Sequence, residues 1–135
     1  MSQSALDELC ARFFGAFSNA AGAAPVHRVY ELCLQQAIIV NATAEPPIAY
    51  DVRAFVEPRE ALLANGTLTD FREYELSNET TLRGPIAWRT SRYAKEWIEN
   101  GLKRQATGTK VFGFVLTTDG WRIASLLWHD DPSAA

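Results

Sequence analysis

His129 is the side chain of this sequence best suited to proton transfer near neutral pH, because an unperturbed imidazole has a pKa of about 6.5. The alternation of faces along a strand puts it beside Lys110, at the end of a face that also carries Phe112 and Phe114. It is therefore the candidate general base; the alternative is an exposed or hydrogen-bonded histidine at a strand end. Asp130 points to the opposite face, so the pattern predicts no metal site.

Two polar residues interrupt apolar stretches and are candidates for binding a ligand. Arg92 shares a strand face with Trp88, where it could bind a carboxylate. The alternatives are a salt bridge or an arginine whose head reaches solvent at the sheet edge. Asn41 lies in a β-branched run and could orient a ligand carbonyl or satisfy backbone groups of its own chain.

Other reactive residue types have simpler structural explanations. Arg59 and Glu60 follow Pro58 at the opening of a helix, and charges that flank Leu62 and Leu63 are an ordinary structural device. Cys10 and Cys33 lie on apolar helical faces with no base or cation nearby, which predicts inert thiols.

The first elements that position these residues are helices. Apolar residues at helical spacing predict an amphipathic helix with its N-cap at Ser4. A second helix begins at Pro25, and the run Ala-Ile-Ile-Val predicts a buried strand over Gln36 to Asn41. The apolar face of the first helix consists of Leu6, Leu9, Cys10, Phe13, Phe14 and Phe17.

A further helical region follows Asp51, which can act as an N-cap. Pro58 divides it into two short pieces, and Asn65 with Gly66, a C-terminal cap signature, ends it. The rest of the sequence is typical of strands.

A first hairpin folds about Gly84, which sets Glu79 opposite Arg89 and Glu73 opposite Lys95. The complementary charges favour this register. One face of the hairpin is polar and also carries Glu75, Ser77, Ser91 and Tyr93. The other face is largely apolar, and we expect it to turn toward the interior; it consists of Tyr74, Leu76, Leu82, Ile86, Trp88 and Arg92.

A second hairpin folds about Asp119-Gly120, a dipeptide that suits a tight turn. This register sets Phe112 opposite Leu127 and Phe114 opposite Ser125. Helices therefore come before an antiparallel sheet, which predicts an α+β domain.

Length and charge limit the function. The 135 residues suit one domain, over residues 1–131, followed by a disordered tail at 132–135. Thirteen basic and 16 acidic residues give a net charge of -3, which argues against nucleic-acid binding. The sequence shows neither a signal peptide nor a membrane span, so we expect a cytoplasmic protein.

Several short segments taken together resemble the nuclear transport factor 2-like superfamily, which includes ketosteroid isomerase and the SnoaL-like polyketide cyclases. These segments are similar to uncharacterised bacterial members, and they are Glu57 to Leu63, Gly66 to Phe71, Ile86-Ala87 with Arg89, Ser91 and Tyr93, and Asp119 to Ile123 leading to Trp128. The resemblance implies a cone-shaped roll in which helices pack on a curved antiparallel sheet. It also implies a pocket between the helices and the concave face, and a homodimer joined through the sheets. The small residues Gly113 and Ala124 would allow close approach of a second layer.

The resemblance does not extend to the catalytic set of ketosteroid isomerase. That enzyme uses a carboxylate base with a tyrosine and a protonated aspartic acid as oxyanion donors. Phe13, Asn41 and Phe112 occupy the matching positions here, and none can do the required chemistry. The same placement implies that these three residues face the pocket.

We therefore expect a domain that binds a small apolar or carbonyl-bearing molecule, with no cofactor and no metal. If it is an enzyme, it is an isomerase, dehydratase or cyclase. The alternatives are a non-catalytic dimeric interaction or ligand-sensing module, and an accessory subunit of a larger enzyme. Its candidate pocket residues are Phe13, Phe17, Asn41, Tyr74, Trp88, Arg92, Phe112, Phe114, Ser125 and His129.

Overall fold

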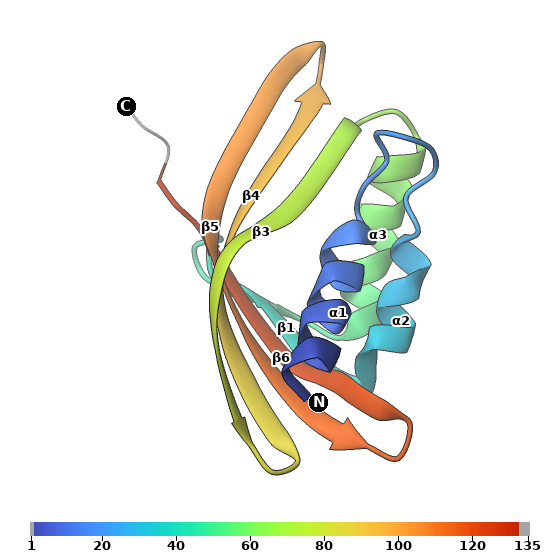
Figure 1. Ribbon diagram of the computed structural model, residues 1–135. Helices are drawn as coiled ribbons and strands as arrows, with labels where there is room; N and C mark the ends of the chain where they lie inside the picture. Colours follow the sequence, from blue (N-terminus) through green and yellow to red (C-terminus); the bar gives the residue numbers. More distant parts are fainter. Residues whose placement is uncertain (1, 133–135) are drawn as a thin grey trace.

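Three helices cover one face of a strongly curved sheet, and no helix of the described residues covers the other face (Figure 1). The computed structural model describes residues 2–132. None of the described helices is long and apolar enough to cross a membrane. In chain order the elements are α1 (Ser2–Gly15), a 3-10 turn (Val26–Arg28), α2 (Val29–Leu32), β1 (Cys33–Asn41), β2 (Ile48–Tyr50), α3 (Val52–Ala64), β3 (Thr69–Arg83), β4 (Ile86–Glu99), β5 (Leu102–Thr117) and β6 (Gly120–Asp130).

The six strands lie in the order β2-β1-β6-β5-β4-β3. Strands β3 to β6 form an antiparallel meander joined by short turns. Strand β1 pairs with β6 in parallel, so the sheet is mixed, whereas the sequence led us to expect an antiparallel one. The difference arises because β1 joins the edge of the meander from a distant part of the chain, and hydrophobic pattern alone does not specify the direction of such a pairing.

Helix α1 carries the predicted aromatic face into the core, and all six residues of that face are buried. The helix begins at Ser2, two residues before the predicted N-cap.

Helix α3 is continuous through Pro58, although two pieces were predicted. Asp51 caps α3 as expected, since its side chain accepts a hydrogen bond of 2.8 Å from the backbone of Ala54. The predicted disordered tail lies outside the described residues except for its first residue.

The first hairpin has the predicted pairing of Glu73 with Lys95, but Arg89 lies opposite Thr80 instead of Glu79. The register shifts between Glu75 and Ser77, where β3 has one extra residue. Such a bulge bends the strand and changes every pairing beyond it.

A second shift between β5 and β6 has a larger effect on the site. Phe114 pairs with Ile123 and Gly113 pairs with Ser125, so one residue of β6 is unpaired. Beyond this bulge Phe112 lies opposite Leu126, where Leu127 was predicted. A shift by one residue turns each later side chain to the opposite face. Ser125 and the residues after it therefore do not face the side that the sequence register predicted.

The polar face of the first hairpin turns inward, which is the reverse of our expectation. Arg89 is fully buried and donates hydrogen bonds to Asp7 of α1, to Glu75 at 3.2 Å and to Thr80 at 2.8 Å. Ser91 is also buried and donates to Glu75 at 2.6 Å. Burial of this arginine is possible because carboxylates from two elements neutralise it.

Candidate functional site

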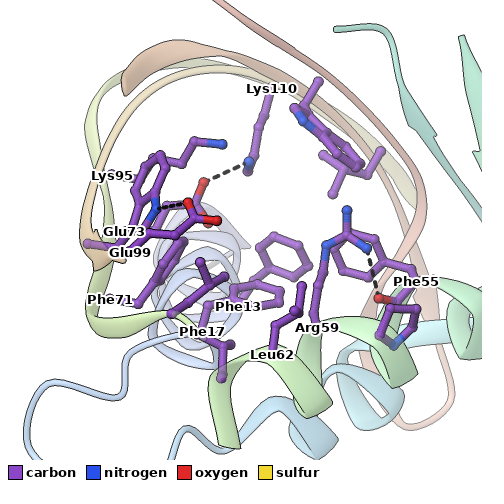
Figure 2. Close-up of a pocket in the computed structure, with 16 residues that line it drawn as sticks. Phe13, Phe17, Phe55, Arg59, Leu62, Phe71, Glu73, Lys95, Glu99 and Lys110 are labelled. Carbon is purple, nitrogen blue, oxygen red and sulfur yellow. Dashed lines mark hydrogen bonds and ion pairs between the residues drawn. The ribbon is translucent and has the colours of Figure 1, made fainter. Parts of the chain in front are cut away.

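A cavity of about 300 Å³ lies between α1, α3 and the concave face of the sheet. Figure 2 shows that its walls combine aromatic and aliphatic side chains with a few charged ones. At roughly 30 Å³ per water molecule in the liquid, the cavity has room for a small organic molecule. The apolar walls include Phe13, Phe17, Phe55, Leu62, Phe71 and Trp97.

Helix α1, the turn that follows it and helix α3 contribute an aromatic cluster to one wall. The ring centroids of Phe13 and Phe17 are 5.3 Å apart, and Phe55 stacks on Phe13 at 6.5 Å. Phe71 and Trp97, from β3 and β4, form a second pair at 5.8 Å. These contacts hold the rings in place, so the apolar surface is largely pre-formed.

Lys110 of β5 and Glu73 of β3 form an ion pair in the wall of the cavity. The Nζ to Oε2 distance is 3.0 Å, and the two side chains are only 6% and 7% exposed. Lys110 Nζ also lies 3.9 Å from the centre of the Tyr93 ring. Burial lowers the pKa of the Lys110 ammonium, and the Glu73 carboxylate opposes that shift.

Asp130 at the end of β6 holds two neighbouring groups. Tyr93 donates a hydrogen bond from its hydroxyl to Oδ1, and Lys95 lies 3.1 Å from Oδ2. Burial raises the pKa of the Tyr93 phenol, and the hydrogen bond to Asp130 adds to the shift. Lys95 lines the cavity, but its charge is already paired.

Arg59 of α3 lies among aromatic rings at the opposite wall. Its Cζ atom is 4.1 Å from the centre of the Phe55 ring and 5.3 Å from that of Trp128. Its Nη1 donates a hydrogen bond of 3.0 Å to the carbonyl oxygen of Phe55. Within residues 2–132 no carboxylate forms an ion pair with Arg59. Burial lowers the pKa of this guanidinium, which nevertheless stays charged at any physiological pH.

Four of the predicted pocket residues come from the aromatic layer. Phe13 and Phe17 line the cavity. Phe112 and Phe114 are buried behind them and do not line it, since the Phe112 ring packs edge-on against Phe13 at 5.6 Å. The aromatic residues are therefore close together, but of these four only Phe13 of α1 and Phe17, just after α1, reach the open space.

Asn41 lies at the end of β1 and does not line the cavity. Its Oδ1 accepts hydrogen bonds from the backbone N–H groups of Thr43 and Ala44, at 3.0 and 3.3 Å. Of the two interpretations of this residue, the structure therefore supports the satisfaction of local backbone groups.

The other predicted pocket residues lie away from the cavity, on the outer face. His129 is exposed beyond the β6 bulge, opposite Thr109. Arg92 forms a bidentate ion pair with Asp131, at 2.7 and 3.0 Å, as its alternative interpretation proposed. These residues lie on the outer face because the polar face of the first hairpin turns inward and because β6 contains a bulge. The other predicted pocket residues placed outside the cavity in this way are Tyr74, Trp88 and Ser125.

Sequence reasoning missed the charged part of the site. The predicted pairing of Glu73 with Lys95 placed two of its members on one face, and Lys110 shares strand parity with Phe112. Those signals would have located this charged cluster if the polar face of the first hairpin had been predicted to face the interior. Arg59 had no comparable signal, because its surroundings come from α3, β2 and β6 together.

The fold is that of the nuclear transport factor 2-like proteins. A nuclear transport factor 2-like protein from Salmonella enterica superposes with a TM-score of 0.79 at 11% identity, over 99% of this chain and 94% of that one. A candidate aromatic ring hydroxylase from Novosphingobium aromaticivorans gives 0.80 at 13%, over 99% and 92%. A candidate calcium/calmodulin-dependent kinase II association domain from Exiguobacterium sibiricum gives 0.73 at 9%, over 97% and 95%. No sequence-family model and no curated protein matches the chain.

Proposed function

We propose that the protein binds a small, largely apolar molecule in the cavity between α1, α3 and the concave face. The observation that carries this proposal is an open volume of about 300 Å³ whose aromatic walls are held by their own contacts. A few charged groups converge on the same space. This combination of apolar walls and few polar groups is typical of ligand sites.

The partners and positions of the candidate acid and base side chains favour binding over catalysis. The Glu73 carboxylate, which could act as a base, is engaged by Lys110 at 3.0 Å. His129, the candidate base, is exposed at the outer end of β6. The geometry of these groups therefore supports a binding or ligand-sensing role more directly than an isomerase, dehydratase or cyclase.

The test is calorimetric titration with two probes of equal shape, 1-naphthylacetate and 1-naphthylacetamide. We expect at least one to bind at a single site. Leu62→Trp places a bulky ring at the cavity wall and should weaken binding about tenfold or more, whereas Leu76→Trp, on β3 outside the cavity, should not. Absence of binding by both probes, or equal effects of the two variants, would overturn the proposal.

We also propose that two copies of the chain pair through the outer face of the sheet. Within residues 2–132 no helix covers this face (Figure 1). It exposes large apolar side chains on several strands. Trp88 is 44% exposed and lies opposite Gly113 on this face. Support comes also from the structural neighbour described as an association domain. The other large apolar residues of the face are Tyr74, Ile86, Val111 and Leu127.

Light scattering at micromolar concentration tests this pairing. The wild-type chain should have the mass of a dimer, and Trp88→Asp should shift it to a monomer because a charge is then buried at the interface. Lys103→Asp, far along the β4–β5 hairpin, serves as a control and should leave the dimer intact. A wild-type monomer contradicts the proposal.

A further inference from the structure

The charged side chains that line the cavity differ in their partners. Lys110 pairs with Glu73, and Lys95 pairs with Asp130. Glu99 accepts a hydrogen bond of 3.1 Å from the indole N–H of Trp97. Among the described residues, Arg59 is the cavity cation that no carboxylate neutralises.

The surroundings of Arg59 explain how it stays partly buried without a carboxylate. Rings of Tyr50, Phe55 and Trp128 lie within 5.4 Å of its Cζ atom. Contact with aromatic faces offsets part of the desolvation cost of a cation. The Phe55 ring is the nearest, at 4.1 Å, and the N–H donors of a guanidinium all lie in its plane. One of these donors is used by the Phe55 carbonyl oxygen.

We propose that Arg59 binds the carboxylate of the ligand, so that the cavity selects small aromatic or alicyclic carboxylic acids. This inference rests on the proposed binding function of the cavity. A carboxylate is the group that a planar guanidinium holds best, because two parallel hydrogen bonds form at once. The cage of rings excludes water from that contact and strengthens it.

The opposite wall gives the ligand a direction. Figure 2 shows Arg59 and Glu73 on opposite sides of the cavity, with Phe13 and Leu62 along its base. The lysines on the Glu73 side are already paired with carboxylates, so the acid group is directed to Arg59, which is the unpaired cavity cation among the described residues. The hydrocarbon part then lies toward Phe71, which is packed against Trp97.

The same probe pair tests the inference and separates its failure from that of the binding proposal. Wild-type protein should bind 1-naphthylacetate about 10- to 100-fold more tightly than 1-naphthylacetamide, as expected for hydrogen bonds to a charged group. Equal affinity, or preference for the amide, overturns the role of Arg59 and leaves the binding proposal standing. Absence of binding by both probes overturns both.

Variants of helix α3 assign the preference to one residue. Arg59→Gln should remove the preference for the carboxylate while the amide affinity stays within about twofold, and Arg59→Lys should restore part of it. Arg53→Gln is the matched control, since Arg53 is on the same helix but exposed and paired with Glu57. If Arg59→Gln retains the full preference, another cation binds the acid. If Arg59→Gln does not fold, Arg59→Lys is compared with wild type instead. The inference is then overturned if both proteins show the same ratio of carboxylate to amide affinity.

Discussion

Lys110 and Glu73 form an ion pair across strand β4, with 3.0 Å between Nζ and Oε2. Lys110 belongs to β5 and Glu73 to β3, and the ammonium lies over the ring of Tyr93 from the strand between them. The pair therefore joins three strands on the concave face, next to the cavity. Because both side chains are buried, removal of either one would leave the other charge without a partner in the protein interior.

Breaking this pair should destabilise the protein more than replacing both partners. Glu73→Gln leaves a buried ammonium and should lower the free energy of unfolding by about 3 to 5 kcal/mol. The double variant Glu73→Leu with Lys110→Met should recover most of that loss. Urea denaturation measures both, and a double variant that is less stable than Glu73→Gln would contradict this account.

Gly108 of β5 is required by the position of Tyr93. A Cβ atom at Gly108 would collide with the Tyr93 hydroxyl and would lie 2.5 Å from the carbonyl oxygen of His129. Gly108→Ala should therefore lower the free energy of unfolding by about 1 to 3 kcal/mol. Gly15→Ala is the control, because a Cβ there meets no atom within 4 Å and should be neutral or stabilising. Thermal denaturation of the two variants provides the comparison, and equal melting temperatures would be inconsistent with this role.

The ion pair between Asp131 and Arg92 should contribute to acid sensitivity. Hydrogen bonds from Arg92 lower the pKa of Asp131 from its ordinary 3.8 to about 2. The unfolded chain then binds more protons than the folded chain between those values, so the stabilisation is complete above the ordinary pKa and is lost as the pH falls through about 2. The unfolding free energy of wild type should fall more steeply than that of Asp131→Asn over this range. Parallel curves in denaturant titrations at several pH values would refute the prediction, and Asp119→Asn in an exposed turn is the control.

The two cysteine thiols should be unreactive in the folded protein. Burial raises the pKa of both Cys10 and Cys33 to about 12, so almost no thiolate is present at neutral pH. Ellman's reagent should label neither thiol in buffer and both in concentrated guanidinium chloride. Rapid labelling of the folded wild type would contradict this, and Thr67→Cys, at an exposed position, provides the positive control.

The elements of the fold could be predicted from local patterns. The apolar spacing of α1, the cap at Asp51 and the Asn65-Gly66 stop lie where the chain order alone indicated helices and their ends. These features depend on residues at most a few turns apart. The pairing of Glu73 with Lys95 was likewise accessible, because both residues belong to one hairpin.

The faces of the strands could not be predicted in the same way. The two register shifts in β3 and the one in β6 each add one residue, and with a period of two a single extra residue reverses every later side chain. The shift in β6 moved His129 out of the expected pocket. No local turn signal marks any of these shifts.

The sequence by itself determined the helical regions and the strands other than β2, because those follow from periodicity and turn residues. Tertiary structure decided which face became the interior. Arg89 can be buried because Asp7, 82 residues earlier in the chain, meets it from α1. Arg59 gained its aromatic cage because β2, α3 and β6 converge on it. Such long-range pairing of charges offsets the cost of burying a polar face, and only the folded chain brings the partners together.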